Sequence, residues 1–326
     1  MDERIGLLHR IISIPSVTGS TGEAGDFLLE WCRSNGLNAE LERGALVVNP
    51  NGKDLLLLGH FDNVPGEIPV RIEGDVLWGR GSVDAKGPLC AALLALKEMP
   101  ELRERVMLVG VPDEEGSSET ARRLRDRIEE RPCIILEPSG WDGITISYNG
   151  RLLLEIEIEA PPSHSGHDQP FSPELAVDLF CSIRELSNPR LIGIEGNITR
   201  TAMKLDFRYP PGEAPQIPAV KERIRTRVIE DTKPYQSDKR SPLVRSFMRG
   251  IRSAGGEPVF KRKTGTADMN VLGEKWRTPI IAYGPGDGRL DHTDEERIDL
   301  NEYIRSIGIV QFAIRDFLKN VDKDNA

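Results

Sequence analysis

Three short segments of the chain each follow an apolar run and together supply one histidine and several carboxylates. They are Gly59-His60-Phe61-Asp62, Val83-Asp84-Ala85-Lys86-Gly87 and Asp113-Glu114-Glu115-Gly116. Imidazole nitrogens and carboxylate oxygens are ligands of zinc and related divalent ions, and hydrolases that use two such ions gather several of them in one site. The residue types therefore indicate a two-metal hydrolase.

Buried strands are expected to position these side chains. Four short apolar runs lead to candidate ligands: 55–58 to His60, 106–111 to Glu114 and Glu115, 133–136 to Glu137, and 279–283 to a Gly-rich loop that reaches His292. Continuously apolar runs bounded by Gly or Pro are typical of parallel strands covered on both faces. Because open α/β sheets bind ligands at the carboxyl ends of their strands, we expect the candidates to converge.

Local spacing suggests roles for the first acids. His60 and Asp62 lie two apart and face the same way, so Asp62 can accept the proton of the ring nitrogen that does not bind metal. Asp84 precedes a helix expected over residues 86–99. Its carboxylate can bridge two cations about 3.5 to 4 Å apart, although Asp is also a common helix cap at this position. Taken alone, His60 would more often be a hydrogen-bonded core histidine than a metal ligand, and only the neighbouring acids favour the ligand.

Candidate ligands later in the chain also lie at strand ends or in loops after strands. Glu114 and Glu115 are consecutive at a strand end and point apart, so one can bind metal while the other addresses a water molecule. Glu137 also ends a strand, with a surface loop acid as the alternative. His292 is preceded by Asp291, a carboxylate that could orient its ring.

The pattern changes after residue 150. Apolar residues at 152, 154, 156 and 158 alternate with Glu155, Glu157 and Glu159, which is typical of an antiparallel strand with one face in solvent. Helices are expected over 173–186 and 219–228, with a strand within 198–207. This order resembles a split β-α-β sandwich.

The predicted fold class is therefore α/β with two domains. Residues 1–150 and 261–326 form a discontinuous di-metal catalytic domain, in which helices flank a mostly parallel central sheet. Residues 151–260 form an inserted α+β, ferredoxin-like sandwich. A chain of 326 residues is longer than a domain with a single hydrophobic core usually is, which agrees with this division.

Composition excludes several other classes. The chain lacks an apolar run of 18 residues, so no membrane span is predicted, and its charged start is unlike a signal peptide. The four cysteines are scattered without metal or disulfide spacing, which favours the cytoplasm. Phosphate-loop and serine-nucleophile motifs are absent from the sequence.

The charge distribution is uneven. The net charge is −9, which argues against nucleic acid as the partner, yet residues 197–263 contain 16 Lys or Arg against 7 Asp or Glu. This cationic sector, as we call residues 197–263, could steer an acidic substrate. A solvated mixed-charge face explains it equally well.

Four motifs in order resemble the co-catalytic metallopeptidase family that includes acetylornithine deacetylase, succinyl-diaminopimelate desuccinylase and carboxypeptidase G. They are Gly59-His60-Phe61-Asp62-Asn63-Val64, Trp78-Gly79-Arg80-Gly81-Ser82-Val83-Asp84-Ala85-Lys86-Gly87, Asp113-Glu114-Glu115-Gly116 and Leu290-Asp291-His292-Thr293. The resemblance covers nearly the whole chain.

This resemblance implies a site with two zinc ions, cobalt being the alternative. Asp84 would bridge the ions, His60 and Glu137 would complete one site, and Glu115 and His292 the other. Glu114 would be the general base and Asp62 the orienting residue behind His60. Family members often have a cis peptide after the bridging Asp, here between Asp84 and Ala85.

The resemblance also implies that the inserted domain is a lid and dimerisation domain of a homodimer. Its segment 162–167 resembles the one whose histidine reaches the substrate carbonyl; His164 is the first choice and His167 the alternative. Residues 265–270 resemble the loop that holds the substrate carboxylate, which implicates Gly265, Thr266 and Asn270. Arg208 lies in a segment resembling a lid strand motif.

Residues 137–141, 263–270 and 284–287 most resemble a subgroup of this family known as LysK. Its members hydrolyse a non-peptide amide bond to release lysine or ornithine from the acidic amino-group carrier protein LysW in lysine and arginine biosynthesis. The alternatives are a deacylase of N-acetyl-lysine, N-acetylornithine or succinyl-diaminopimelate, or a dipeptidase or carboxypeptidase. A protein that docks the carrier without catalysis would not explain Glu114.

Overall fold

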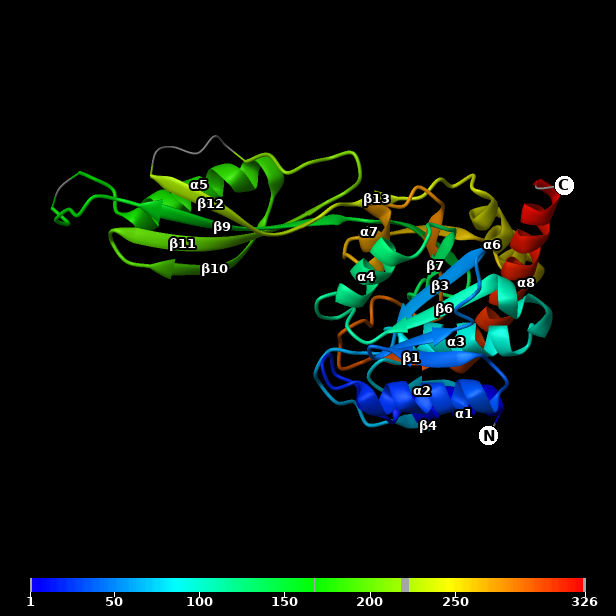
Figure 1. Cartoon of the computed structure of the whole chain (residues 1–326). Coiled ribbons are helices and arrows are strands. Elements are labelled where there is room, and N and C mark those ends of the chain that lie inside the picture. Colours follow the sequence, from blue (N-terminus) through cyan, green and yellow to red (C-terminus); the bar gives the residue numbers. More distant parts are fainter. Residues whose placement is uncertain (1, 167, 218–222, 325–326) are drawn as a thin grey trace. The chain divides into compact units, whose positions relative to one another are not determined.

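The structure is a computed structural model that describes residues 2–166, 168–217 and 223–324. The chain divides into two compact units (Figure 1). We call residues 1–146, 237–262 and 267–326 the main unit, and residues 147–236 with 263–266 the inserted unit. All four cysteines are free, and in the described part of the chain no helix is long and apolar enough to cross a membrane.

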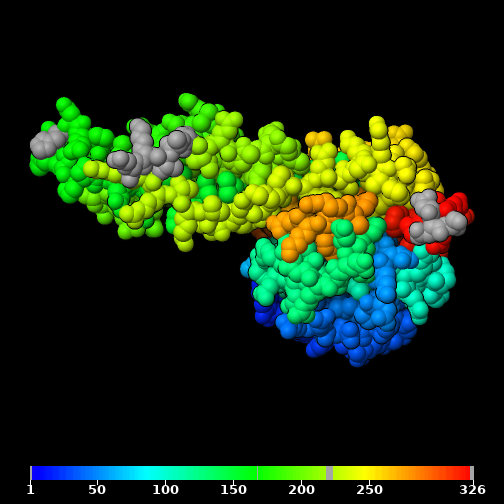
Figure 2. All heavy atoms as spheres, turned by 45° about the horizontal axis from the view of Figure 1, so that its top comes forward, coloured from blue at the N-terminus to red at the C-terminus, as the bar shows by residue number. Residues whose placement is uncertain are grey.

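The main unit contains most of the helices. They are α1 (Glu3–Ile12), α2 (Gly22–Ser34), α3 (Lys86–Lys97), a 3₁₀ turn (Pro100–Arg105), α4 (Glu119–Arg127), α6 (Pro242–Ser253), α7 (Asp268–Gly273) and α8 (Leu300–Asp324). Asp2 starts α1 by accepting the Arg4 N–H. Figure 2 shows α7, in orange, against α4, where the Arg125 guanidinium donates to the Val271 carbonyl.

A mixed sheet forms the centre of this unit. Its strands are β1 (Ala39–Glu42), β2 (Ala45–Val48), β3 (Leu55–His60), β6 (Val106–Val111), β7 (Cys133–Ile135), β8 (Gly143–Tyr148), β14 (Val259–Lys263) and β15 (Ile280–Ala282). The order is β1-β2-β6-β3-β7-β15-β8, and β14 also pairs with β8. The central strands β6, β3, β7 and β15 are parallel. The predicted mostly parallel sheet flanked by helices is confirmed.

The core lies between this sheet and its helices. The first α3 turn begins directly after Ala85, and the α3 side chains from Leu89 to Leu96 are buried. Four apolar side chains of α6 join the same core as α8. This packing explains why residues 237–260, which the sequence assigned to the inserted domain, group with the main unit instead.

A second, small antiparallel sheet lies in the main unit. It joins β4 (Arg71–Glu73), β5 (Val76–Trp78) and β16 (Arg297–Asp299) in the order β16-β5-β4. The guanidinium groups of Arg71 and Arg297 lie 4.2 and 4.6 Å from the centre of the Trp78 ring. Such cation–π contacts stabilise the pairing of these short strands.

The inserted unit is an antiparallel sheet with one described helix. Its elements are β9 (Gly150–Glu159), α5 (Ser172–Ser187), β10 (Arg190–Gly196), β11 (Arg200–Tyr209) and β12 (Ile224–Thr232). The short strand β13 (Tyr235–Gln236) does not join this sheet but pairs with residues 147 and 148 of β8. The sheet order is β10-β11-β9-β12, and buried Leu154, Ile156 and Ile158 of β9 pack with α5. This is the strand order of a ferredoxin-like sandwich.

One element of the inserted unit was predicted wrongly. A helix was expected over 219–228, but residues 224–228 belong to β12, and residues 218–222 lie outside the described part. The β-branched residues Ile224, Thr226 and Val228 pair with Ile158, Ile156 and Leu154 of β9. Tertiary pairing thus overrides the helical interpretation.

Candidate metal centre

The carboxyl ends of the parallel strands bring the candidate ligands together. His60 ends β3, Glu114 and Glu115 follow β6, and Glu137 follows β7. These three strands are neighbours in the sheet, and the next strand, β15, leads to the loop with His292. Asp84 joins them from the segment between β5 and α3.

His60, Asp84 and Glu137 form a first triad. The Nε2 atom of His60 lies 3.2 Å from Oδ1 of Asp84 and 3.4 Å from Oε1 of Glu137. The second triad consists of Asp84, Glu115 and His292. Here Nε2 of His292 lies 2.9 Å from Oε1 of Glu115 and 3.1 Å from Oδ2 of Asp84. The two oxygens of Asp84 therefore face different histidines, as a bridging ligand requires.

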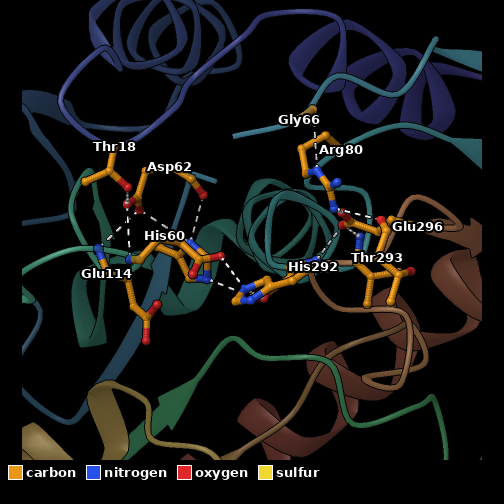
Figure 3. A network of polar contacts seen from close by, with 12 residues as sticks. Thr18, His60, Asp62, Gly66, Arg80, Glu114, His292, Thr293 and Glu296 are labelled. Carbon is orange, nitrogen blue, oxygen red and sulfur yellow. Dashed lines mark hydrogen bonds and ion pairs between the residues drawn. The ribbon is translucent and has the colours of Figure 1, made fainter. Parts of the chain in front are cut away.

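Asp62 contacts both the His60 ring and the turn that follows β6 (Figure 3). The Nδ1 atom of His60 lies 3.0 Å from the Asp62 carbonyl and 3.4 Å from its Oδ1. The same carboxylate accepts the Glu114 and Glu115 N–H groups, each at 3.2 Å, and the Thr18 hydroxyl at 2.7 Å. Asp62 therefore contacts both the His60 ring and the main chain of the turn that carries the two glutamates.

The site concentrates negative charge. Burial and the carboxylates of Asp268 and Glu137 raise the pKa of Glu114 well above its ordinary value. Burial raises the pKa of Glu115, and burial also raises the pKa of Asp268 to about 7.

The histidines respond to the same charges in the opposite sense. Hydrogen bonds that the protonated ring donates to Asp84 and Glu115 raise the pKa of His292 to about 10. Burial opposes protonation of His60, but the neighbouring carboxylates of Asp62 and Asp84 outweigh it and raise its pKa. All these shifts show a cluster that demands positive charge, which protons or metal cations can supply.

The donor set fits divalent cations. Among the described residues, three groups of His and acidic side chains offer ligand atoms within 4.8 Å of one another. They are His60-Asp84-Glu137, Asp84-Glu115-His292 and His60-Glu114-Glu115. Nitrogen and carboxylate ligands with no cysteine suit zinc, cobalt and manganese. The peptide bond between Asp84 and Ala85 is cis, as the family resemblance implied.

The expected substrate-binding residues divide between the units. In the main unit, Asn270 is buried, and its side-chain oxygen accepts the Ala267 N–H at 2.9 Å, so it caps α7. In the inserted unit, Gly265 is exposed and Thr266 half-buried. Arg208 also lies there, with Nε 3.5 Å from Oδ1 of Asp206.

The two candidate lid histidines differ in what the structure describes. His164 is exposed in the inserted unit, and its Nδ1 accepts the Gly166 N–H at 3.2 Å. In the neutral ring the hydrogen is then on Nε2. His167 lies outside the described residues.

Several residues of the site were not found from the sequence. Thr18 belongs to an N-terminal loop whose position no local pattern predicts. Glu296 and Arg80 form a buried ion pair, with Nη1 and Oε2 3.0 Å apart. Asp268 is 2% exposed and begins α7. An acid at a helix start looks like a cap, so the sequence gives no signal that Asp268 adds to the charge of the site.

Several known proteins are similar to this chain in sequence or in fold. A protein of Pyrococcus abyssi named as a candidate LysW-lysine/LysW-ornithine hydrolase is 40% identical over 337 aligned positions, covering 99% of this chain and 96% of the relative. The LysW-lysine hydrolase of Deinococcus radiodurans is 36% identical over 345 positions, covering 94% and 95%. The YXEP protein of Bacillus subtilis, described as a dinuclear metal-binding peptidase, superposes with a TM-score of 0.77 at 11% identity, covering 97% of this chain and 98% of that one.

The fold and the sequence likeness define a hydrolase of the metallopeptidase class. Residues 56–316 match the description "Peptidase family M20/M25/M40". The chain belongs to this family.

Proposed function

We propose that this chain is a metal-dependent amide hydrolase that releases lysine or ornithine from the carrier protein LysW. The observation that carries the chemistry is Asp84, whose two oxygens face the histidines of two triads. The names of its relatives from P. abyssi and D. radiodurans support the substrate. The reaction would serve lysine or arginine biosynthesis.

Two divalent ions, zinc foremost and cobalt as the alternative, are the proposed cofactors. His60, Asp84 and Glu137 would hold one ion, and Asp84, Glu115 and His292 the other. Such ions polarise the scissile carbonyl and lower the pKa of water. Asp62 keeps the His60 ring turned with Nε2 towards Asp84 and Glu137, because its own oxygens face Nδ1.

Glu114 is the proposed general base. It follows β6 in the site but belongs to neither triad that contains Asp84, so its carboxylate is available for proton transfer. Its N–H is held by Asp62 at 3.2 Å, which fixes the turn from which the side chain projects. Glu114 takes a proton from the attacking water and returns it to the leaving amine, while the carbon–nitrogen bond breaks.

The inserted unit is proposed as a lid and as the contact of a homodimer. His164 would donate from Nε2 to the substrate oxygen as negative charge develops there. Gly265, Thr266, Asn270 and Arg208 are the proposed contacts for the amino-acid part of the substrate. These assignments stay predictions.

Only some of the arginines in the cationic sector are available to bind an acidic partner. In the inserted unit, Arg200 and Arg227 pair with Glu157 and Glu155 of β9 at 2.5 and 2.6 Å, which neutralises part of its charge. In the main unit, exposed Arg245 and Arg252 lie on one face of α6. We propose these two arginines as contacts for the carrier.

The deciding experiment measures free lysine and ornithine released from carrier protein with the amino acid γ-glutamyl-linked, beside the N-acetyl amino acids, with zinc or cobalt supplied. Release from the carrier with little from the acetyl compounds is expected. The reverse would identify a small-molecule deacetylase.

A second experiment tests the carrier contact. Turnover of the carrier should fall as the salt concentration rises, and the double variant Arg245→Gln, Arg252→Gln should show a higher KM for the carrier only. Salt-insensitive turnover contradicts the proposed carrier contact.

A further inference from the structure

The small sheet beside the metal centre aligns two segments that carry ligands. Its strand β16 begins one residue after Glu296, and its strand β5 ends just before Gly79. Arg297 is the register partner of Trp78, and the Gly79 N–H donates to the Glu296 carbonyl at 3.3 Å. The segment that leads to Asp84 therefore runs beside the segment that follows His292.

Glu296 connects these segments through its side chain (Figure 3). The residue is 1% exposed. Its Oε1 atom accepts the N–H groups of Val83 and Asp84 at 3.0 and 3.2 Å. A carboxylate buried in this way is costly unless its oxygens are hydrogen-bonded, and here the donors are the main-chain N–H groups of the shared ligand Asp84 and of the residue before it.

Arg80 holds the other oxygen of Glu296. Its Nη1 atom lies 3.0 Å from Oε2 of Glu296 and donates to the Thr293 carbonyl at 2.8 Å. Its Nε atom donates to the Gly66 carbonyl at 2.9 Å. One guanidinium thus joins the loop after β3, the segment of Asp84 and the loop of His292. These are the segments that bring ligands to both triads.

We propose that Glu296, held by Arg80, is a positioning residue that fixes the Asp84 carboxylate between the two triads. The orientation of the Val83 and Asp84 N–H groups sets the direction of the Asp84 side chain, whose oxygens must face His60 and His292 at the same time. The inference rests on the proposed metal-dependent function. Residues that hold ligands in place typically change metal affinity or activity about 10- to 100-fold when they are replaced.

The variant Glu296→Gln tests this role, because it keeps the size of the side chain and removes the charge. Asp294→Asn is the matched control: Asp294 lies in the same loop, 3.7 Å from Nη2 of Arg80, and is fully exposed. Affinity for Zn²⁺ and Co²⁺ is measured by titrating metal-free protein, with melting temperature in chelator as the measure of folding. Release of the amino acid from carrier-linked substrate then gives kcat and KM.

For Glu296→Gln we expect the affinity of at least one of the two metal sites to fall about 10- to 100-fold. The kcat should fall by a similar factor, with KM nearly unchanged. Asp294→Asn should behave like the wild type. If Glu296→Gln does not fold, Glu296→Asp replaces it; this variant keeps the charge beside Arg80, but it is too short to reach Arg80 and both N–H groups together, so affinity should again fall.

The positioning role is refuted if Glu296→Gln or Glu296→Asp folds and binds both metal ions as tightly as the wild type. It is also refuted if Asp294→Asn loses as much affinity as Glu296→Gln, because a general charge effect then accounts for the loss. A wild-type protein that binds no divalent ion contradicts the proposed function itself. A wild type that binds two ions but does not release lysine or ornithine contradicts only the proposed substrate.

Discussion

The close approach of Gly59 in β3 to Leu136, the residue after β7, allows a test of how the sheet sets the geometry of the metal centre. A Cβ atom on Gly59 would lie 2.7 Å from the Cβ atom of Leu136. Apolar carbons pack best at about 3.5 to 4.0 Å, so Gly59→Ala requires the strands to separate by about 1 Å. The Leu136 Cβ atom is bonded to its main chain and cannot rotate away.

This displacement falls directly on the first triad. His60 follows Gly59, and Glu137 follows Leu136; Nε2 and Oε1 of these ligands are 3.4 Å apart. Overpacking of this kind costs about 1 to 3 kcal/mol in the free energy of unfolding. A misplacement of about 1 Å at a catalytic site can cost about 100-fold in rate. We therefore expect Gly59→Ala to lose activity and metal affinity more than its modest loss of stability explains.

The assay combines chemical denaturation, divalent-ion titration and turnover of the carrier-linked substrate. Gly110→Ala is the matched control, because Gly110 of β6 is the register partner of Gly59. Its added Cβ atom would meet the Phe61 ring at 3.3 Å and Leu46 at 3.5 Å, so a smaller adjustment suffices. Wild-type metal affinity and turnover in Gly59→Ala would show that the strand spacing does not determine the geometry of the triad.

Three further predictions follow from other contacts. Glu114→Gln should lower kcat by about 100- to 10,000-fold, as for loss of a general base, while metal content measured by atomic emission stays at the wild-type level; near-normal turnover would contradict the base assignment. Chelation should lower the melting temperature, and restoring metal to about 100 times its Kd should return about 2.7 kcal/mol per site; identical melting curves with and without metal would contradict a resident cation. Although burial opposes it, hydrogen bonds from Arg249 and Ser246 lower the pKa of Asp316 below 3.8, so its stabilising effect is present above pH 3.8 and is lost as the pH falls through the lowered value. Asp316→Asn should thus cost about 1 kcal/mol or less at pH 7, and the difference should shrink on acidification in denaturation curves; a difference independent of pH would refute this reasoning.

The sequence predicts the centre of the fold well because its strands are continuously apolar. The runs at 55–58 and 106–111 are buried on both faces, which is typical of parallel strands in a sheet covered by helices on both sides. The change to period-2 alternation at β9 likewise marks the inserted unit. The structure places the five expected ligands and Glu114 within one cluster, since the rule about strand ends needs only the strands and their direction.

The remaining features depend on pairings too short or too distant to leave a local pattern. The strands β4, β5 and β16 have three residues each, less than periodicity can reveal. Their pairing places Glu296 beside the Asp84 segment, so the sequence could not identify that contact. The end of the inserted domain was missed for a related reason: α6 is amphipathic in either domain, and only its packing on α8 decides where it belongs.

The position of β15 has a consequence for synthesis on the ribosome. This strand lies between β7 and β8, although β7 and β8 are made long before it. A nascent chain that has just passed residue 236 contains every strand of the β10-β11-β9-β12 sheet but lacks β15, α8 and His292. We therefore expect the inserted unit to fold first, while the main sheet stays open until translation is nearly finished. The capacity to bind both cations would then be among the last properties that a new molecule acquires.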